Sequence, residues 1–217
     1  MRIPGLAIAS VLALCAARPA AAALTLNATG LSYGFTLSTF ATGNTYSYNH
    51  LSAAPLSDGM LAVVDFANGA IVKYNDVDGQ TTGTNLGSVS LTNVTNIARV
   101  GGHTYAGTYG GGYYEVSSSL SLTAISVPGI THQWGFWGNN ATGHLVAQTF
   151  SGVVDFDPVT GLSTVIANVS GDGVSVSPNG ATAYVAVSGG IASYSIPSGT
   201  PGFFELKRTR TLGPIFD

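Results

Sequence analysis

The amino-acid sequence predicts an all-β fold built from repeated antiparallel sheets. Charged residues make up only 8% of the 217-residue chain, whereas glycine occurs 29 times and tyrosine 10 times. Helices favour Glu, Lys, Arg and Gln, while β-branched and aromatic residues between Gly-rich turns favour short strands. In addition, one short pattern recurs along the chain at a nearly constant interval.

The recurring pattern is a glycine-containing turn, a hydrophobic anchor, two variable residues, and then an aromatic or β-branched residue. Its copies cover 69–74, 111–116, 151–156 and 189–194. The anchors are Ile71, Tyr113, Val153 and Ile191. Their nearly even spacing, a period of about 40 residues, is the length of one four-stranded blade of a β-propeller. We therefore expect a β-propeller, or part of one, with the anchors at equivalent places between sheets.

The last copy shows the order of strands within a blade most clearly. Strands are expected over 173–176, 182–187 and 191–196, and Ser177-Pro178-Asn179-Gly180 has Pro and Asn-Gly where a tight turn needs them. A fourth, outer strand is expected over 120–127 and 162–169 in the two preceding copies. Short strands at regular spacing with turn signals between them indicate repeated antiparallel sheet.

Several of these segments resemble blades of the YVTN/NHL-type propellers, a superfamily with gluconolactonase-like and streptogramin-lyase-like members. The similar segments are 177–180, Tyr184-Val185-Ala186-Val187, Gly190-Ile191 with Tyr194, and the turn over 155–161. The resemblance covers roughly 51–198 and implies blade architecture. It does not specify an activity, because such blades host many functions.

The segment over 1–23 reads as a bacterial signal peptide rather than as part of the fold. Arg2 is followed by an apolar run over 6–17 and by small residues over 20–23, with cleavage expected near Ala22 or Ala23. The run is shorter than the roughly 20 residues that a membrane span needs. We therefore expect a secreted or periplasmic protein with no transmembrane anchor after cleavage. The only cysteine, Cys15, would be removed with the signal.

The remaining chain divides into a propeller or propeller fragment over 24–204 and an irregular basic tail over 205–217. The tail holds three of the chain's seven basic residues, Lys207, Arg208 and Arg210. Two architectures are open. In one, Phe35–Phe40 supplies the outer strand of the last blade and four blades close into a ring. In the other, favoured by the abrupt change of composition at the tail, the chain is cut short and the propeller is incomplete.

The charge of the predicted propeller argues against a nucleic acid partner. Between 24 and 204 the chain has two basic and eight acidic residues, a net charge of −6. Such a surface repels phosphate backbones.

No nucleophile elbow, Gly-rich phosphate loop or His-Glu-x-x-His zinc motif occurs, so candidate chemistry rests on position alone. The residues that lead into each innermost strand should gather at the mouth of the central channel. They are His50, Asn93, His132 and Asp172. Imidazoles, an amide and a carboxylate at this mouth could hold a divalent cation or transfer protons. The catalytic candidates are His50 and His132. The candidate metal ligands are His132 and Asp172. The alternative is that these residues cap strand ends or bind channel water.

The resemblance bears on this mouth, because the related lactonases and lyases place metal and catalytic residues there. The acidic metal-ligand pattern of the lactonases is not matched in this sequence. Trp134, Phe136 and Trp137 form the densest aromatic group. Trp134 and Trp137, with Asn93, are candidates for stacking on a sugar or another flat ligand, and core filling between blades is the alternative. His103 and His144 should lie in turns near the opposite face.

The sequence thus predicts an exported, non-enzymatic binding or scaffold propeller whose partner is an unknown small molecule, glycan or protein. The alternative is a propeller lyase or lactonase-type hydrolase with a divalent metal at the central channel. No cofactor is implied with certainty, and a divalent cation is the one possibility.

Overall fold

A computed structural model describes residues 28–34, 36–43, 50–196 and 206–210. The predicted signal peptide over 1–23 lies outside the described residues. The chain divides into two units, of which the first includes the short helix α1 (Ala28–Ser32) and the second, Ser38–Gly213, holds the described strands. None of the helices that the structure describes is long and apolar enough to cross a membrane.

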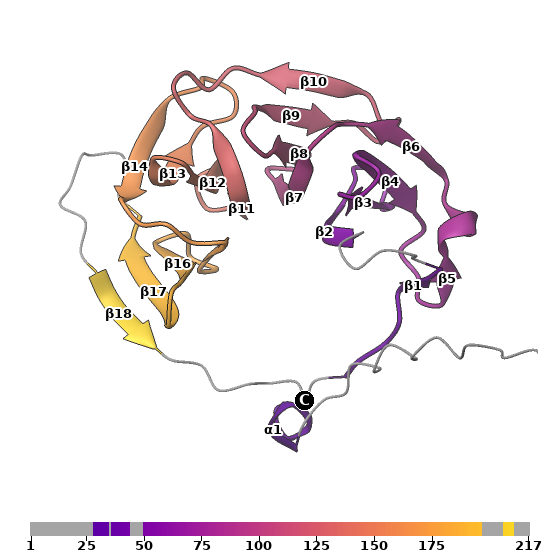
Figure 1. Cartoon of the computed structure of the whole chain (residues 1–217), viewed down its shortest axis with the longest axis horizontal. Helices are drawn as coiled ribbons and strands as arrows, with labels where there is room; N and C mark the ends of the chain where they lie inside the picture. Colours follow the sequence, from indigo (N-terminus) through magenta and orange to yellow (C-terminus); the bar gives the residue numbers. More distant parts are fainter. Residues whose placement is uncertain (1–27, 35, 44–49, 197–205, 211–217) are drawn as a thin grey trace, which may run out of the picture. The chain divides into compact units, whose positions relative to one another are not determined.

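Four antiparallel sheets of four strands follow one another along the described part of the second unit (Figure 1). Blade 1 consists of β2 (His50–Pro55), β3 (Leu61–Asp65), β4 (Ala70–Tyr74) and β6 (Gly87–Ser90). Blade 2 consists of β7 (Val94–Val100), β8 (His103–Thr108), β9 (Tyr113–Val116) and β10 (Leu122–Ile125). Blade 3 consists of β11 (His132–Asn139), β12 (His144–Thr149), β13 (Gly152–Phe156) and β14 (Ser163–Ala167). Blade 4 consists of β15 (Gly173–Val176), β16 (Thr182–Val187), β17 (Gly190–Ser195) and β18 (Leu206–Arg210).

The only other described strands are a short parallel pair, β1 (Ala41–Thr42) and β5 (Gln80–Thr81), and a single 3₁₀ turn, η1 (Thr82–Thr84), follows β5. The all-β propeller prediction is confirmed, because no described helix exceeds two turns and the sheets are consecutive four-stranded meanders. In blade 4, two predicted strands are reproduced to the residue and the third is shifted by one. Gly180 has φ +72°, which is the left-handed conformation that the predicted turn requires.

The outer strand of blade 4 comes from a segment that neither predicted architecture placed there. Leu206–Arg210, expected to be irregular, forms β18 and pairs with β17, so the outer strand of blade 4 comes from the basic tail and not from Phe35–Phe40. Unpaired backbone groups at the edge of β17 favour the addition of any extended segment. Phe40 instead packs edge-on against Tyr74 of blade 1, with ring centroids 5.8 Å apart.

The hydrophobic core lies between consecutive blades. Ile71, Tyr113 and Val153, three of the predicted anchors, are buried in the clusters that join blades 1 and 2, blades 2 and 3, and blades 3 and 4. The fourth anchor, Ile191, is half-buried. The innermost strands contact in series, β2 with β7, β7 with β11, and β11 with β15. The described strands show no comparable contact of β15 with β2, so the four blades do not close into a ring.

Candidate functional site

The innermost strands of the first three blades share an irregularity at their N-terminal ends. The strand register shifts between His50 and Ala53 in β2, between Val94 and Asn96 in β7, and between His132 and Phe136 in β11. The described pairing of β15 with β16 has no such shift. A β-bulge re-aims the side chains around it and is frequent beside functional sites. In β11 the irregular stretch contains Trp134.

Trp134 is the centre of a group of aromatic rings at this end of the blades. Its indole lies 4.9 Å from the ring of Tyr109 and 6.2 Å from that of Phe66, measured between centroids, and Tyr109 lies 5.5 Å from Phe150. These separations are typical of favourable aromatic pairs. Tyr109 and Phe150 are 39% and 57% exposed, so these two rings are accessible to a ligand. We refer to Phe66, Tyr109, Trp134 and Phe150 as the aromatic surface.

Three members of the aromatic surface occupy one position of the repeat. Phe66, Tyr109 and Phe150 each follow directly after the second strand of their blade, β3, β8 or β12. The corresponding residue after β16 is Ser188, so blade 4 interrupts the series. Equivalent turns of neighbouring blades lie at the same end of the sheets, and this explains why residues from separate repeats meet.

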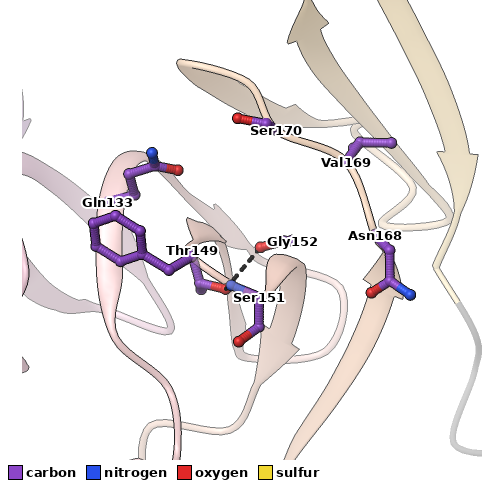
Figure 2. Close-up of a pocket in the computed structure, with 8 residues that line it drawn as sticks. Gln133, Thr149, Ser151, Gly152, Asn168, Val169 and Ser170 are labelled. Atoms are coloured by element: carbon purple, nitrogen blue, oxygen red, sulfur yellow. Dashed lines mark hydrogen bonds between the residues drawn. The ribbon is translucent and has the colours of Figure 1, made fainter.

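A polar pocket of about 350 Å³ adjoins the aromatic surface, and Phe150 belongs to both. Figure 2 shows Asn168, Val169 and Ser170, on the segment that connects β14 to β15, across the opening from Gln133, Thr149 and Ser151. The eight lining residues carry no formal charge. The wall is held by hydrogen bonds, since the Thr149 hydroxyl donates to the Gly152 carbonyl at 2.8 Å.

The segment opposite is fixed by a fully buried amide. Gln148 Nε2 donates to the Val169 carbonyl at 2.9 Å, and its Oε1 is buried without a hydrogen-bond partner in the structure. The same nitrogen also donates to the Thr149 carbonyl at 3.3 Å. The fully buried amide therefore ties the segment around Val169 to the end of β12, because breaking the bond would cost a hydrogen bond of a side chain that water does not reach.

His132, the candidate for both catalysis and metal binding, is a fully buried histidine between blades 2 and 3. Its Nε2 lies 2.9 Å from the Thr95 hydroxyl, and its ring meets those of Tyr113 and Phe136 edge-on. Burial lowers the pKa of the imidazole to about 3, so the ring is neutral at ordinary pH. Gly107 lies against the ring, where a Cβ would approach within 2.7 Å.

The other members of the predicted ring have different surroundings. Asn93 is exposed in a turn with φ +59°, and its carbonyl accepts the amide of Tyr109 at 2.8 Å. Asp172 is exposed just before β15. His50 begins β2, and its side chain is not among those described. The part of the chain that the structure describes holds no group of three or more His, Cys, Asp or Glu suited to a metal ion, so the cation site stays a prediction.

Two further histidines pair with carboxylates at the other end of the same strands. His103 begins β8, with Nδ1 2.6 Å from Glu115 Oε1, and His144 begins β12, with Nδ1 2.9 Å from Asp155 Oδ2. Burial raises the pKa of Asp155, while the hydrogen bond to His144 opposes this shift. Because the aromatic residues follow the opposite ends of β8 and β12, these pairs lie away from the aromatic surface.

The aromatic candidates of the sequence separate in the structure. Phe136 is buried between blades 2 and 3, where it meets Tyr113, and Trp137 is 49% exposed. Trp134 alone joins the aromatic surface, whose other members were not selected from the sequence. The available signal was their shared place in the repeat, which a search for local density overlooks.

Solved structures with a similar fold are β-propellers of diverse function. No protein-family model matches the sequence, and no curated protein matches it either. A catalytically inactive virginiamycin B lyase from Staphylococcus aureus, solved with quinupristin, superposes with a TM-score of 0.57 at 10% identity, over 76% of this chain and 57% of that chain. A putative 6-phosphogluconolactonase from Bacteroides uniformis gives a TM-score of 0.56 at 16% identity, over 82% of this chain and 60% of that one.

A third similar structure is the Swd1 β-propeller domain from Myceliophteria thermophila, with a TM-score of 0.56 at 16% identity, over 76% of this chain and 59% of that one. The chain therefore spans less than two thirds of the length of each of these three proteins. At such identities the similarity shows the β-propeller fold and carries no activity with it.

Proposed function

We propose that this protein is an exported, non-enzymatic binding module that holds its ligand on the aromatic surface. The observation that carries the proposal is the continuous contact of four rings from three blades, with Tyr109 and Phe150 substantially exposed. A contiguous apolar patch that remains exposed to solvent is typical of a ligand or partner site. The adjoining polar pocket supplies groups that can orient a ligand.

The same geometry favours binding over the lyase or lactonase-type alternative. General acid–base catalysis needs an imidazole or carboxylate within hydrogen-bond reach of the substrate. Of the described histidines, His132 is buried against Thr95, and His103 and His144 hold carboxylates at the far strand ends. Asp65, beside Phe66, accepts hydrogen bonds from the backbone and side-chain nitrogens of Asn68 through its two oxygens.

Export is the second part of the proposal. It is supported by the positively charged start, the apolar run over 6–17 and the small residues over 20–23. Expression of the full chain in a bacterial host should yield an extracytoplasmic product whose N-terminal residue is near Leu24. A product that stays in the cytoplasm and retains residues 1–23 would contradict export.

The binding surface can be tested through tryptophan fluorescence, because the chain has only two tryptophans. In a Trp137→Phe background, Trp134 reports on the aromatic surface alone. We expect at least one class in a panel of oligosaccharides, nucleosides and aromatic amides to change the emission saturably and to be recovered chemically unchanged. Tyr109→Ala should weaken that binding about ten-fold, since stacking contributes roughly 0.5–1.5 kcal/mol per ring pair.

The matched control is Val159→Ala, which removes an exposed apolar side chain from the turn after β13. It should leave the affinity unchanged. Absence of saturable binding by every class would contradict the proposal, and conversion of the bound compound to a product would replace it with an enzymatic function.

A further inference from the structure

We propose that the ligand is a neutral carbohydrate, with one sugar ring stacked on the aromatic surface and its neighbour hydrogen-bonded in the adjoining pocket. This inference rests on the proposed function and names its ligand class. It depends on the juxtaposition of exposed aromatic rings with an uncharged, amide- and hydroxyl-lined pocket, linked through Phe150.

The aromatic side of the site suits the apolar face of a sugar. A pyranose ring presents aliphatic C–H groups on its flat faces and hydroxyls around its rim. Tyr109 and Phe150 are exposed and their planes are inclined at 70°, so they offer two differently oriented apolar surfaces at the edge of the pocket. Trp134 contacts Tyr109, with ring centroids 4.9 Å apart and planes inclined at 41°, and so restricts the movement of that ring. Aromatic rings of this kind bury apolar area and lose little conformational freedom on binding.

The pocket side suits the hydroxyl rim. The amides of Gln133 and Asn168 each offer donors and an acceptor, and the hydroxyls of Ser151 and Ser170 can act as either. The Thr149 hydroxyl is already bonded to Gly152 and Ser151 within the wall. Sugar hydroxyls also donate and accept, so an amide- and hydroxyl-lined wall can satisfy them in several orientations. The volume of about 350 Å³ falls at the lower end of the roughly 300–1,000 Å³ found for small-ligand sites.

The charges argue for a neutral sugar rather than an acidic or phosphorylated one. No residue that lines the pocket is basic. The propeller segment over 24–204 carries two basic and eight acidic residues, and Asp172 is exposed two positions after Ser170. Recognition of carboxylate or phosphate groups normally uses Arg or Lys. An anionic ligand would therefore meet a negative field with no local compensation.

Gln148 is a positioning residue for this site. Its Nε2 fixes the Val169 carbonyl at 2.9 Å, and thereby the backbone that carries Asn168 and Ser170. Gln148 is fully buried, so it acts on the pocket through the backbone and not by contact with the ligand.

The test is a fluorescence titration of the Trp137→Phe protein with neutral hexasaccharides of glucose, mannose and N-acetylglucosamine, and with an acidic hexagalacturonate. We expect saturable binding of at least one neutral oligosaccharide and at least ten-fold weaker binding of the acidic one. Phe150→Ala and Asn168→Ala should each lower the affinity about ten-fold. Phe150→Tyr, which keeps the ring, should restore it, and Leu162→Ala, at an exposed site beyond β13, should have no effect.

The outcomes separate this inference from the function on which it rests. If no neutral oligosaccharide binds but a nucleoside or aromatic amide does, with loss in Tyr109→Ala, the carbohydrate inference is overturned and the binding function stands. Equal binding of the acidic hexagalacturonate would also overturn it. If no compound of any class binds, both proposals fail. Circular dichroism and urea unfolding of each variant confirm that a lost signal is not lost folding.

Discussion

Blades 3 and 4 arise from the same repeat but are buried differently. Val146 on β12 and Tyr184 on β16 hold the same place in their blades, yet Val146 is fully buried and Tyr184 is 42% exposed. Along β12, every residue after the first is buried, whereas buried and exposed residues alternate in β16. This contrast shows that a blade's second face is buried only where another sheet covers it, although both blades form the same strands.

The two blades also differ at the ligand-binding end. Blade 3 has a bulge in its innermost strand and carries Trp134 and Phe150. In blade 4, β15 pairs regularly, the exposed Asp172 precedes it, and Ser188 holds the position of Phe150. The proposed site therefore uses blades 1 to 3, with the segment that leads into blade 4 forming one wall of its pocket. The repeat determines the strands that all blades share, and the proposed site is formed by residues that differ from one blade to the next.

The largest predicted difference between blades 3 and 4 is in the free energy of unfolding after one aromatic side chain in each blade is truncated. Phe156→Ala in blade 3 should lower the free energy of unfolding by about 3–5 kcal/mol, because Phe156 is fully buried against Tyr113 and Phe136. Tyr184→Ala in blade 4 should change it by less than about 0.5 kcal/mol. Urea unfolding measures both. Equal losses would mean that the exposed face of β16 is covered in solution, and the comparison would fail.

A smaller effect should appear in the pH dependence of the free energy of unfolding. Among the described side chains, only blade 3 has a buried histidine, His132, at the start of its innermost strand. The pKa of His132 is about 3 in the folded protein and about 6.5 when unfolded. Between these values the unfolded chain binds a proton that the folded chain does not, so stability falls as the pH is lowered from 6.5 towards 3. The loss between pH 7 and pH 5 should be about 2 kcal/mol.

The matched variants for this experiment are His132→Gln and His103→Gln, studied by urea unfolding at both pH values. His132→Gln should abolish this component of the pH dependence, and His103→Gln, at an exposed histidine, should retain it. The assignment to His132 would be wrong if His132→Gln kept the full difference in stability between the two pH values.

The smallest effect concerns the contact that ties blade 4 to blade 3. Asn139 is buried, its Nδ2 donates to the Gly180 carbonyl at 3.0 Å, and its Oδ1 accepts the Ala141 amide at 3.2 Å. Asn139→Ala should cost about 1 kcal/mol by leaving these buried groups unsatisfied. Amide hydrogen exchange should accelerate in β15 and β16 but not in β7 and β8.

The exposed neighbour Asn140 provides the control, since Asn140→Ala removes the same amide at the surface. It should not accelerate exchange in blade 4. Uniform acceleration across all four blades in Asn139→Ala would show that blade 4 does not open separately, and that the two blades do not differ in local stability.

Local patterns were enough to predict much of the fold. The turn Ser177–Gly180 and the strands around it follow from Pro, Asn and Gly at positions with defined backbone demands, and alternating apolar residues predict the flanking strands. The anchors Ile71, Tyr113 and Val153 were predicted between sheets because their spacing matches a blade, and all three are buried there. β18 was missed, because a basic segment of mixed composition becomes a strand only when a free sheet edge is available to it.

The site was less predictable, because its members come from three blades. Trp134 was selected from local aromatic density, but Phe66, Tyr109 and Phe150 are single aromatics in separate turns and have no local signal. His132 was assigned to an open channel mouth, although it is buried between blades 2 and 3. Its side-chain direction depends on the bulge in β11, which sequence periodicity does not reveal.

The order of the strands within a blade, and the approximate bounds of the first three strands of blade 4, follow from the sequence alone, because turn chemistry and alternation act over a few residues. Which faces are buried, where the rings of Phe66, Tyr109, Trp134 and Phe150 meet, and whether His132 reaches solvent are settled only at the level of tertiary structure. These features depend on contacts between residues of different repeats. Such contacts form only when one blade packs on the next, and no local pattern encodes them.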